Sequence, residues 1–524
     1  MQASVDPLLF GEAAGRPGRS AMMAPPAVWQ LLLPLGLLCL CSSAASLSGG
    51  ATAEGAADYV VVATSWLKTK PVCQGLRVDA PANLTASSWV PLSHSYGPCS
   101  VAAAGSWSTP APADVLRQDQ RRAGYIQRKL AGSTPQDDNG SDLPESDCKS
   151  GQSEHAPTIQ PNVGQDSSPT SEGSEAVSVI EPTAGGGGGG GGQRVPGVKQ
   201  TMVLDTASDV AWVQCAPCPM PQCHPQTDTI YDPSQSSTYA PFACGSPVCR
   251  QLGPYGNGCA AGSRQCQYRV LYPDGRSTMG TYISDVLRLN PTSVIGGFQF
   301  GCSHAVQGHF PNDTAGIMAL GRGAQSLASQ TRLTYGGVFS YCLPRTASYS
   351  GFFVLGVPRV AAARYALTPM FAIPQAPMLY LVRLRAIVVA GQVLAVPPAV
   401  FAPGSVVDSR SVITRLPPTA YAALRAAFRA RMGMYRAAPP KQQLDTCYDL
   451  SGVRRVTLPT ITLVFDHSAA VELDPSGILY NDCLAFAPGT DDRAWGVIGN
   501  VQLQTYEVLY NVAGGAMGFR RAAC

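Results

Sequence analysis

Val203-Leu204-Asp205-Thr206-Ala207-Ser208 is the stretch that decides the fold, and Val406-Val407-Asp408-Ser409-Arg410-Ser411 repeats its pattern. In each copy two apolar residues run into an aspartate, which a hydroxyl residue follows directly. A single Asp-Thr or Asp-Ser is common, because such residues cap helices and turns. Two copies, each behind a strand-like run and about two hundred residues apart, indicate that the fold brings Asp205 and Asp408 together.

A pair of aspartates in one site has a definite chemistry. Two adjacent carboxylates cannot both ionise cheaply, so one pKa rises and the other falls. One carboxylate then takes a proton from water while the other gives a proton to a carbonyl oxygen, with no metal and no covalent intermediate. We expect Thr206 and Ser409 to tie the two loops together beneath the pair, and Ser208 to bind the outer oxygen of Asp205.

Three further motifs accompany the pair in a fixed order. They are Tyr272-Pro273-Asp274-Gly275, Ala315-Gly316-Ile317-Met318-Ala319-Leu320-Gly321 and Trp495-Gly496-Val497-Ile498-Gly499-Asn500. With Trp212-Val213-Gln214-Cys215 after the first aspartate, residues from about 195 to 524 resemble a pepsin-like aspartic protease of the plant nepenthesin type. This resemblance implies an all-β, bilobal fold with the active-site cleft between two lobes, and an aspartic endopeptidase activity at acid pH that uses no cofactor.

The resemblance also assigns a flap to the turn at 272–275. Tyr272, Asp274 and Gly275 are then expected to contact substrate, because a closing flap excludes water from the aspartate pair. Pro273 stands where the family usually has glycine and stiffens the turn. An ordinary hairpin tyrosine is the alternative for Tyr272.

The composition narrows the range of partners. The chain has 524 residues, 14% charged residues and a net charge of +3, which argues against nucleic acid as the main partner. Its 54 glycines and 44 prolines suit a loop-rich β protein. We expect a monomer whose partners are a peptide or protein substrate and the chain's own prosegment.

The cysteines indicate an oxidising compartment. Seventeen are present, too many for a cytosolic enzyme of this kind. Cys215-Ala216-Pro217-Cys218 has the spacing of a redox motif, and the cluster near His224 could hold zinc. Structural disulfides are favoured over both alternatives, since the count from position 215 onward is even; their pairing stays open. The candidates are Cys215, Cys218, Cys223, Cys244, Cys249, Cys259, Cys266, Cys302, Cys342, Cys447, Cys483 and Cys524.

The chain before the first motif has three predicted parts. Residues 1–45 form a signal peptide, with an apolar run at 28–41 that is short for a membrane span; an uncleaved anchor is the alternative. Residues 46–194 form a prosegment, of which 133–194 read as disordered linker ending in glycines 185–192. We therefore expect a secreted protein, destined for the cell wall or the vacuole. Asn312 is a candidate glycosylation site.

Within the prosegment, residues 114–131 are predicted to form a helix. Its apolar residues fall on one face: Leu116, Ala123, Ile126 and Leu130. It also carries five basic residues: Arg117, Arg121, Arg122, Arg128 and Lys129. By family resemblance this helix covers the acidic cleft until acid releases it. A solvated basic helix is the alternative.

The protease-like part divides into lobes at 195–355 and 356–524. In the first lobe we find no Gly-Thr-Pro turn, and only Val177-Ser178-Val179-Ile180 resembles the strand that the family places before the first motif. Part of that lobe's edge is therefore predicted to be missing or replaced. In the second lobe, residues 419–432 are predicted to form the helix that follows the second motif.

The third residue of each motif departs from the family, which has glycine there. Ala207 and Arg410 keep the backbone N–H that is expected to donate towards the opposing carboxylate. An inward guanidinium at Arg410 would favour two ionised carboxylates, and an outward one could bind an acidic side chain. Two hypotheses follow: a secreted aspartic endopeptidase, or a catalytically weak protease-like protein that binds or inhibits another protein. The intact pair favours the first.

Overall fold

The computed structural model describes residues 58–66, 73–75, 87–94, 99, 111–132, 157–159, 179–181, 197–219, 221–260, 262–272, 275–308, 310, 314–346, 348–360 and 362–524. All of them belong to one compact unit, Ala56–Cys524. The predicted signal peptide lies outside these residues, as do Asp274 and Asn312.

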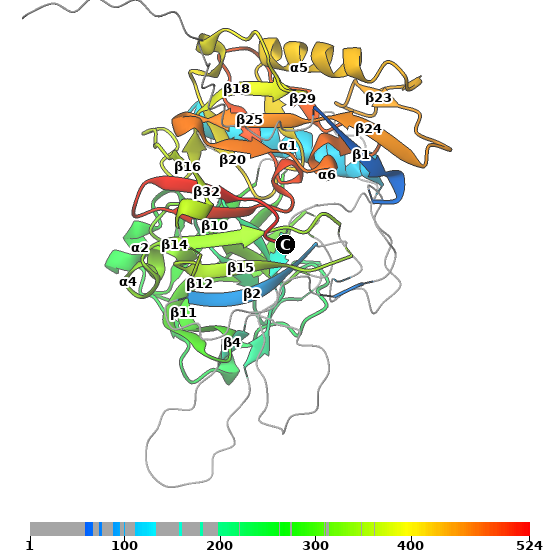
Figure 1. Ribbon diagram of the computed structural model, residues 1–524. Coiled ribbons are helices and arrows are strands. Elements are labelled where there is room, and N and C mark those ends of the chain that lie inside the picture. The colour runs from blue at the N-terminus through cyan, green and yellow to red at the C-terminus, as the bar shows by residue number, and fades with distance from the viewer. Residues whose placement is uncertain are drawn as a thin grey trace, which may run out of the picture. The chain divides into compact units, whose positions relative to one another are not determined.

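The largest sheet joins strands between residues 87 and 369 to two strands at the C-terminal end of the chain and closes on itself. β31 (Glu507–Asn511) pairs with β14 (Val338–Cys342) on one side and with β32 on the other, so neighbouring strands follow in the order β2, β15, β14, β31 and β32. Figure 1 shows β2, β15, β14 and β32 in this order. The predicted lobe boundary therefore falls within a sheet that continues across it. Its other strands are β2 (Ser87–His94), β3 (Pro157–Ile159), β4 (Val179–Glu181), β5 (Val198–Lys199), β6 (Met202–Asp205), β7 (Trp212–Gln214), β8 (Ala240–Pro241), β9 (Gly256–Cys259), β10 (Cys266–Leu271), β11 (Ser277–Asn290), β12 (Ser293–Gln307), β13 (Gly316–Ala319), β15 (Gly351–Gly356), β16 (Ala366–Pro369) and β32 (Ala516–Arg520).

Strands from the predicted prosegment complete the edge of this sheet. β2 pairs antiparallel with β15, and β3 lies between β2 and β6. β4 pairs with β11 and β5. Residues 133–194 are therefore not linker throughout, because β3 and β4 lie within them, and β4 overlaps the strand-like run at 177–180.

The strands between residues 381 and 498 form three smaller sheets. The first has the strand order β17-β20-β30-β21-β29, the second β19-β18-β25-β26 and the third β22-β23-β28-β27; β1 pairs with β24. These strands are β1 (Tyr59–Ala63), β17 (Leu381–Val382), β18 (Leu384–Val389), β19 (Gln392–Val393), β20 (Ser405–Val407), β21 (Thr414–Leu416), β22 (Ala437–Ala438), β23 (Cys447–Tyr448), β24 (Arg455–Pro459), β25 (Ile461–Phe465), β26 (Ala470–Glu472), β27 (Leu479–Tyr480), β28 (Cys483–Leu484), β29 (Phe486–Pro488) and β30 (Gly496–Ile498). The described chain is mostly β, which confirms the predicted all-β class.

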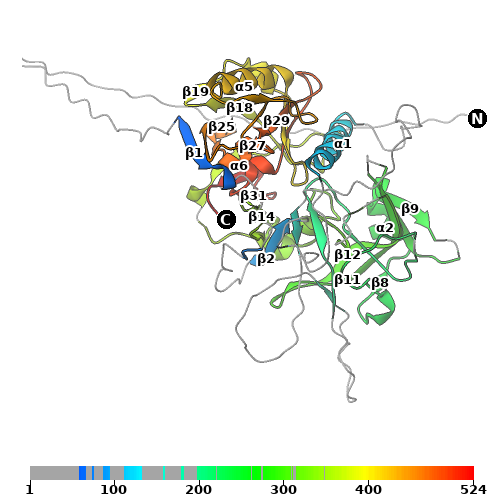
Figure 2. The ribbon, with the colours of Figure 1, turned by 90° about the vertical axis from the view of Figure 1, so that its right-hand side faces the viewer.

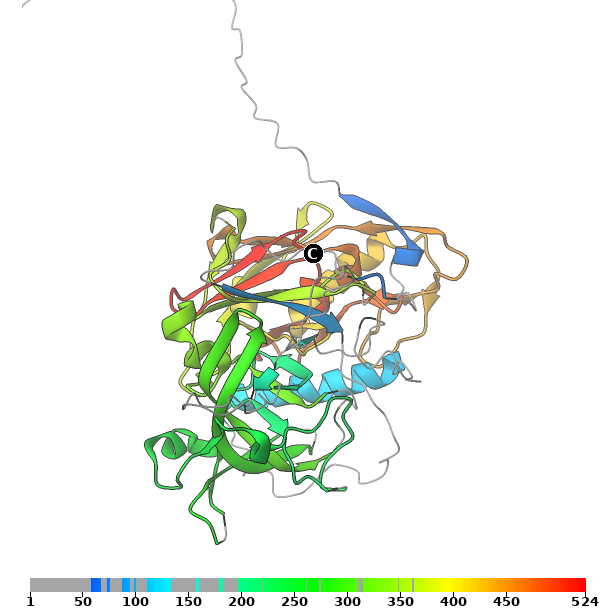
Figure 3. The same ribbon diagram turned by 90° about the horizontal axis from the view of Figure 1, so that it is seen from below.

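Two long helices match predicted ones. α1 (Pro112–Leu130) was expected at 114–131, and α5 (Pro418–Arg431) at 419–432. α1 begins with proline at its first position, where the missing N–H costs nothing. Figures 2 and 3 show α1, in cyan, between strands of the first half of the chain and those of the second. The short α-helices are α2 (Pro247–Gln251), α3 (Leu327–Gln330), α4 (Arg332–Tyr335) and α6 (Pro475–Ile478).

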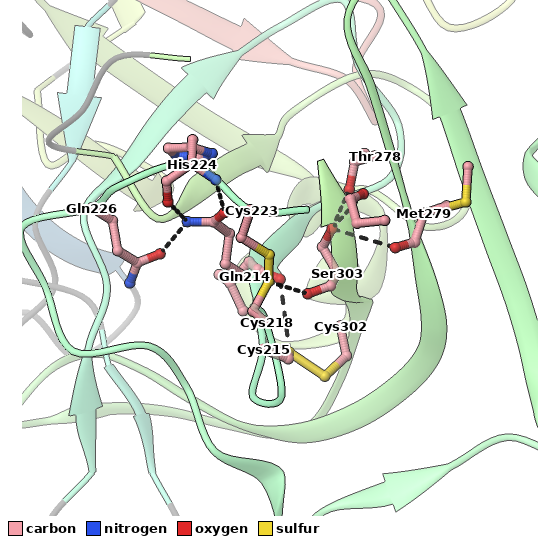
Figure 4. Close-up of a disulfide and its surroundings, with 12 residues drawn as sticks. Gln214, Cys215, Cys218, Cys223, His224, Gln226, Thr278, Met279, Cys302 and Ser303 are labelled. Carbon is pink, nitrogen blue, oxygen red and sulfur yellow. Dashed lines mark hydrogen bonds between the residues drawn. A yellow bond between two sulfur atoms is a disulfide. The ribbon is translucent and has the colours of Figure 1, made fainter. Parts of the chain in front are cut away.

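All twelve candidate cysteines form disulfides, which confirms the disulfide prediction. Cys215 is bonded to Cys302 of β12, and Cys218 to Cys223, so the cysteines of the candidate redox motif bond elsewhere (Figure 4). A further bond, Cys73–Cys99, lies before the protease-like part. The other pairs are Cys244–Cys259, Cys249–Cys266, Cys342–Cys524 and Cys447–Cys483.

The main core lies where the sheets of the two halves meet. Phe339 of β14 stacks on Tyr510 of β31 with ring centroids 4.5 Å apart, and Tyr380 meets Tyr510 edge-on at 4.8 Å. Tyr380 donates its hydroxyl to the backbone oxygen of Leu320, 2.7 Å away. The N–H of Val407 donates to the backbone oxygen of Tyr380 at 3.1 Å, so Tyr380 links the segments that hold the two aspartates. Over the described part of the chain, no helix has the length and apolar character that crossing a membrane requires.

Candidate active site

The first aspartate ends a fully buried strand. β6 runs parallel to β13, and the N–H of Leu320 donates to the backbone oxygen of Asp205 at 2.9 Å. Gly316 begins β13, where an added Cβ would lie 1.9 Å from the backbone oxygen of Trp212. Only glycine fits this close approach, so the Ala-Gly motif fixes the position of Asp205.

The second aspartate is held in the same way. β20 runs parallel to β30, and the N–H of Asp408 donates to the backbone oxygen of Ile498 at 3.2 Å. An added Cβ on Gly499 would lie 2.6 Å from the backbone oxygen of Val412. Asn500 donates its side-chain amide to the backbone oxygen of Ser409 at 2.9 Å. The 495–500 motif therefore supports the second loop as the 315–321 motif supports the first.

The two hydroxyl residues link the loops beneath the aspartates. The N–H of Ser409 donates to Oγ1 of Thr206 at 3.0 Å, and the N–H of Thr206 donates to Oγ of Ser409 at 3.2 Å. Ser409 Oγ also donates to the backbone oxygen of Leu204 at 3.1 Å. The structure places both residues where the sequence pattern predicted them.

Each carboxylate receives a hydroxyl from the serine three residues later. Ser208 Oγ donates to Asp205 Oδ2, and Ser411 Oγ to Asp408 Oδ2, each at 2.7 Å. Ser411 was missed, although the repeated Asp-x-x-Ser spacing was a visible signal. One expectation was wrong: the N–H of Ala207 donates to Asp205 of its own loop, at 2.9 Å, rather than to the opposing carboxylate.

Arg410 points inward. Its Nη1 lies 2.9 Å from Oδ2 of Asp205, and its side chain is only 3% exposed. Burial alone would raise the pKa of Asp205, but the charges of Arg122 and then Arg410 hold that pKa well below its usual range. Of the two directions that the sequence left open, the structure shows the one that favours an ionised Asp205.

Helix α1 places a second guanidinium across the aspartate pair. Arg122 Nη2 lies 2.6 Å from Asp205 Oδ1 and 2.8 Å from Asp408 Oδ1. Its Nε donates to Asp408 Oδ2 at 3.0 Å, and its Nη1 to Asp205 Oδ2 at 3.2 Å. These are charge-assisted bonds from one planar fork to both carboxylates. Arg122 therefore binds all four carboxylate oxygens of the pair.

The rest of α1 is also fixed to the site. Lys129 Nζ donates to the backbone oxygen of Ala207 at 3.2 Å, and Gln127 donates to that of Trp495 at 2.7 Å. The four apolar residues of the predicted face are buried, while Arg117 is exposed. The alternative of a solvated helix is therefore wrong.

The turn predicted as a flap lies at the end of β10. Tyr272 is buried, accepts a hydrogen bond from Nε1 of Trp212 at 2.8 Å and packs edge-on against Phe310. Burial raises its pKa well above the usual value, so the hydroxyl stays neutral. Gly275 makes the turn with a φ of +82°, and its N–H donates to the backbone oxygen of Tyr272 at 3.1 Å.

Comparison with known proteins supports the same class as the geometry. Residues 192–357 match the family model described as xylanase inhibitor N-terminal, and 379–521 match xylanase inhibitor C-terminal. An aspartyl protease family protein of Arabidopsis thaliana is 34% identical, over 93% of this chain and 97% of its own length. The chain therefore belongs to the family of plant pepsin-like aspartic proteases.

One more relative by sequence and one solved structure are also similar to this chain. Aspartic proteinase nepenthesin-2 of Nepenthes gracilis is 29% identical over 63% of this chain and 76% of its own. Basic 7S globulin from soybean has a similar fold, with a TM-score of 0.50 and 19% identity over 62% of this chain and 88% of its own. The similarity to nepenthesin-2 agrees with the family assignment. The similarity to basic 7S globulin concerns the fold alone.

Proposed function

We propose that the chain is the inactive precursor of an aspartic endopeptidase, with α1 as the part of the prosegment that blocks the site. The observation that carries this proposal is the pairing of Asp205 and Asp408, fully buried and joined by one guanidinium. Both carboxylates keep their supporting serine, and the loops keep their hydroxyl link. These features are the ones that the general acid–base chemistry of a carboxylate pair needs.

The mechanism begins when α1 leaves. A water molecule then takes the place of Arg122 between the carboxylates. Asp205, held ionised by Arg410, takes a proton from this water as its oxygen attacks the peptide carbonyl, and Asp408 gives a proton to the carbonyl oxygen. As the C–N bond of the tetrahedral intermediate breaks, Asp205 gives its proton to the leaving amine nitrogen and Asp408 takes a proton back from a hydroxyl of the intermediate, which becomes the product carboxyl group. Tyr272, Asp274 and Gly275 contact the substrate from the flap.

The pH dependence of release follows from Asp205. The pKa of Asp205 is lowered in the folded protein. The ion pairs of this carboxylate therefore stabilise the state in which α1 lies on the site, and this stabilisation is fully present above the unfolded pKa of about 4. That stability is lost only as the pH falls through the lower, folded value. Acid release of α1 through this carboxylate therefore needs a pH below the ordinary carboxyl range.

A second candidate function rests on Arg410. This residue faces Asp205 in the precursor, and the same contact in the mature protein would oppose the form of the pair that shares one proton. A protein with this feature would cleave peptides weakly and could act instead by binding or inhibiting another protein through the cleft. Ala207 in place of glycine supports the same alternative, and the fully supported pair supports the enzyme.

Proteolysis of a denatured protein between about pH 2 and 7 separates the two candidates. The protein is assayed after loss of α1 has been verified by intact mass, with and without pepstatin, beside Asp205→Asn. Activity in acid that pepstatin and the substitution both abolish is the expected result. No cleavage by the verified processed form overturns the endopeptidase proposal, and a gain of activity in Arg410→Gly then identifies the guanidinium as the cause.

We also propose that the protein passes through the secretory pathway to the cell wall or the vacuole as a monomer, with Asn312 as its candidate glycosylation site. The seven disulfides of the described residues support an oxidising compartment. The peptide or protein substrate binds in the cleft through backbone contacts of the strand-addition type.

A further inference from the structure

A second buried ion pair joins α1 to the cleft, beside the pair at Arg122. Asp119 of α1 places Oδ2 2.6 Å from Nη1 of Arg415 and Oδ1 2.6 Å from the backbone N–H of Val412. Asp119 and Arg415 are 3% and 4% exposed. Nη2 of Arg415 also binds Oε1 of Gln120 at 3.0 Å. One guanidinium and one backbone N–H therefore form a fork that grips a carboxylate from two directions.

The fork belongs to the cleft rather than to α1. Arg415 lies on β21, which the Asp408 loop leads into, and Val412 lies within that loop, four residues after the aspartate. Val412 belongs to a buried apolar cluster that also contains Ile413 and Ala487 of the second lobe. Tyr480, on β27, is a titratable group whose pKa is influenced by Asp119. Burial raises the pKa of Tyr480 most, and the charge of Asp119 raises it further.

The fork also lies near the reacting atoms. Asp119 precedes Arg122 by three residues, which is about 4.5 Å along a helix axis. An extended peptide advances about 3.3 Å per residue. The fork therefore lies within reach of a side chain no more than about three residues from the scissile bond.

We propose that Arg415 and the N–H of Val412 form an acidic-residue subsite of the mature enzyme, which α1 fills with Asp119 in the precursor. This inference rests on the proposed endopeptidase function and adds a substrate preference to it. When α1 leaves, the fork loses its carboxylate, and a glutamate or aspartate side chain of the substrate restores both bonds. Arg415 is a specificity-determining residue in this account, distinct from Arg410, which contacts Asp205.

The preference has a defined pH dependence. A guanidinium stays charged at every pH of interest, whereas a substrate glutamate has an ordinary pKa of about 4.3. Above that pKa the glutamate is ionised and takes the charge-assisted bonds, and below it the acid is neutral and gains little over glutamine. A merely structural role for Arg415 predicts no such change.

The test uses pairs of peptides that differ only by Glu or Gln at one of three positions on either side of a bond that the enzyme cleaves. kcat/KM is measured at about pH 3 and about pH 5.5, which bracket the glutamate pKa. At one position we expect the Glu peptide to be favoured about tenfold or more at the higher pH, as a charge-assisted bond allows, and much less at the lower pH.

The variant is Arg415→Gln, made together with Asp119→Asn so that the precursor buries no unpaired carboxylate; after loss of α1 the mature form differs only at 415. Its Glu/Gln ratio is expected to fall to about one. The control is Arg425→Gln, on α5, whose partner Asp445 lies outside the cleft contacts of α1, and its ratio should stay that of the wild type. A wild-type ratio near one at every position, or an unchanged ratio in the variant, overturns the subsite.

Failure of the proposed function gives a different result. In that case neither peptide of a pair is cleaved, and the dissociation constants of the same peptides, labelled with a fluorophore, are measured on the processed protein by anisotropy. Tighter binding of one Glu peptide that Arg415→Gln removes supports the subsite on a binding protein. Equal binding of Glu and Gln peptides overturns it.

Discussion

Replacing Arg122 by methionine removes the charge that joins α1 to both aspartates while keeping a long side chain. The two carboxylates are 0% exposed and the Arg122 side chain is 9% exposed. Removing one partner of a buried ion pair costs about 3–5 kcal/mol. Because Arg410 still pairs with Asp205 in the variant, we expect the lower end of that range, which is roughly a hundredfold change in the opening equilibrium of α1.

Hydrogen exchange of the α1 amides at pH 7 measures this opening directly. We expect exchange in Arg122→Met to be faster by about two powers of ten at this helix, with strands such as β12 unchanged. The control is Arg117→Met on the same helix, whose side chain is 54% exposed and pairs with Asp114; such a surface pair contributes about 0–1 kcal/mol.

The pH dependence supplies a second check of the same reasoning. Since the pKa of Asp205 is lowered in the folded state, the difference between wild type and Arg122→Met should be constant above about pH 5 and shrink only well below pH 4. Equal exchange in Arg122→Met and Arg117→Met would refute the claim that Arg122 holds the helix. A difference that disappears already near pH 6 would refute the assignment to Asp205.

Three other substitutions test the site. Arg410→Gly should raise the pKa of the aspartate pair and move the neutral-side limb of the pH–activity profile of the processed enzyme upward by about 1–3 units; an unmoved limb contradicts the role of this guanidinium. Thr206→Val leaves the N–H of Ser409 without its acceptor, and a urea titration should show a loss of about 1–3 kcal/mol in the free energy of unfolding. Gly316→Ala should lower the free energy of unfolding by about 3 kcal/mol or more, or prevent folding, because an added Cβ would approach a backbone oxygen too closely. The control is Gly296→Ala, which has open space around it and should change the free energy of unfolding by less than about 0.5 kcal/mol. Equal melting temperatures for the two glycine variants would contradict the packing argument.

Much of the site could be predicted from the sequence because its signals are local. A strand that ends in Asp-Thr or Asp-Ser places a carboxylate and a hydroxyl at fixed positions relative to one another. The glycines at 316 and 499 stand where a second strand passes too close for a side chain. The period of apolar residues likewise identified the buried face of α1, since residues three or four apart share one side of a helix.

What the sequence by itself determined about this protein is the class of its fold, the two aspartates and the hydroxyl residues that support them. Only the tertiary structure decided that Arg410 turns inward, that Arg122 rather than its four basic neighbours spans the pair, and that Asp119 binds Arg415. The physical reason is that these contacts join residues from 83 to 296 positions apart. Their geometry depends on how two separately formed sheets and a helix pack together, and no local pattern of residue types records that packing.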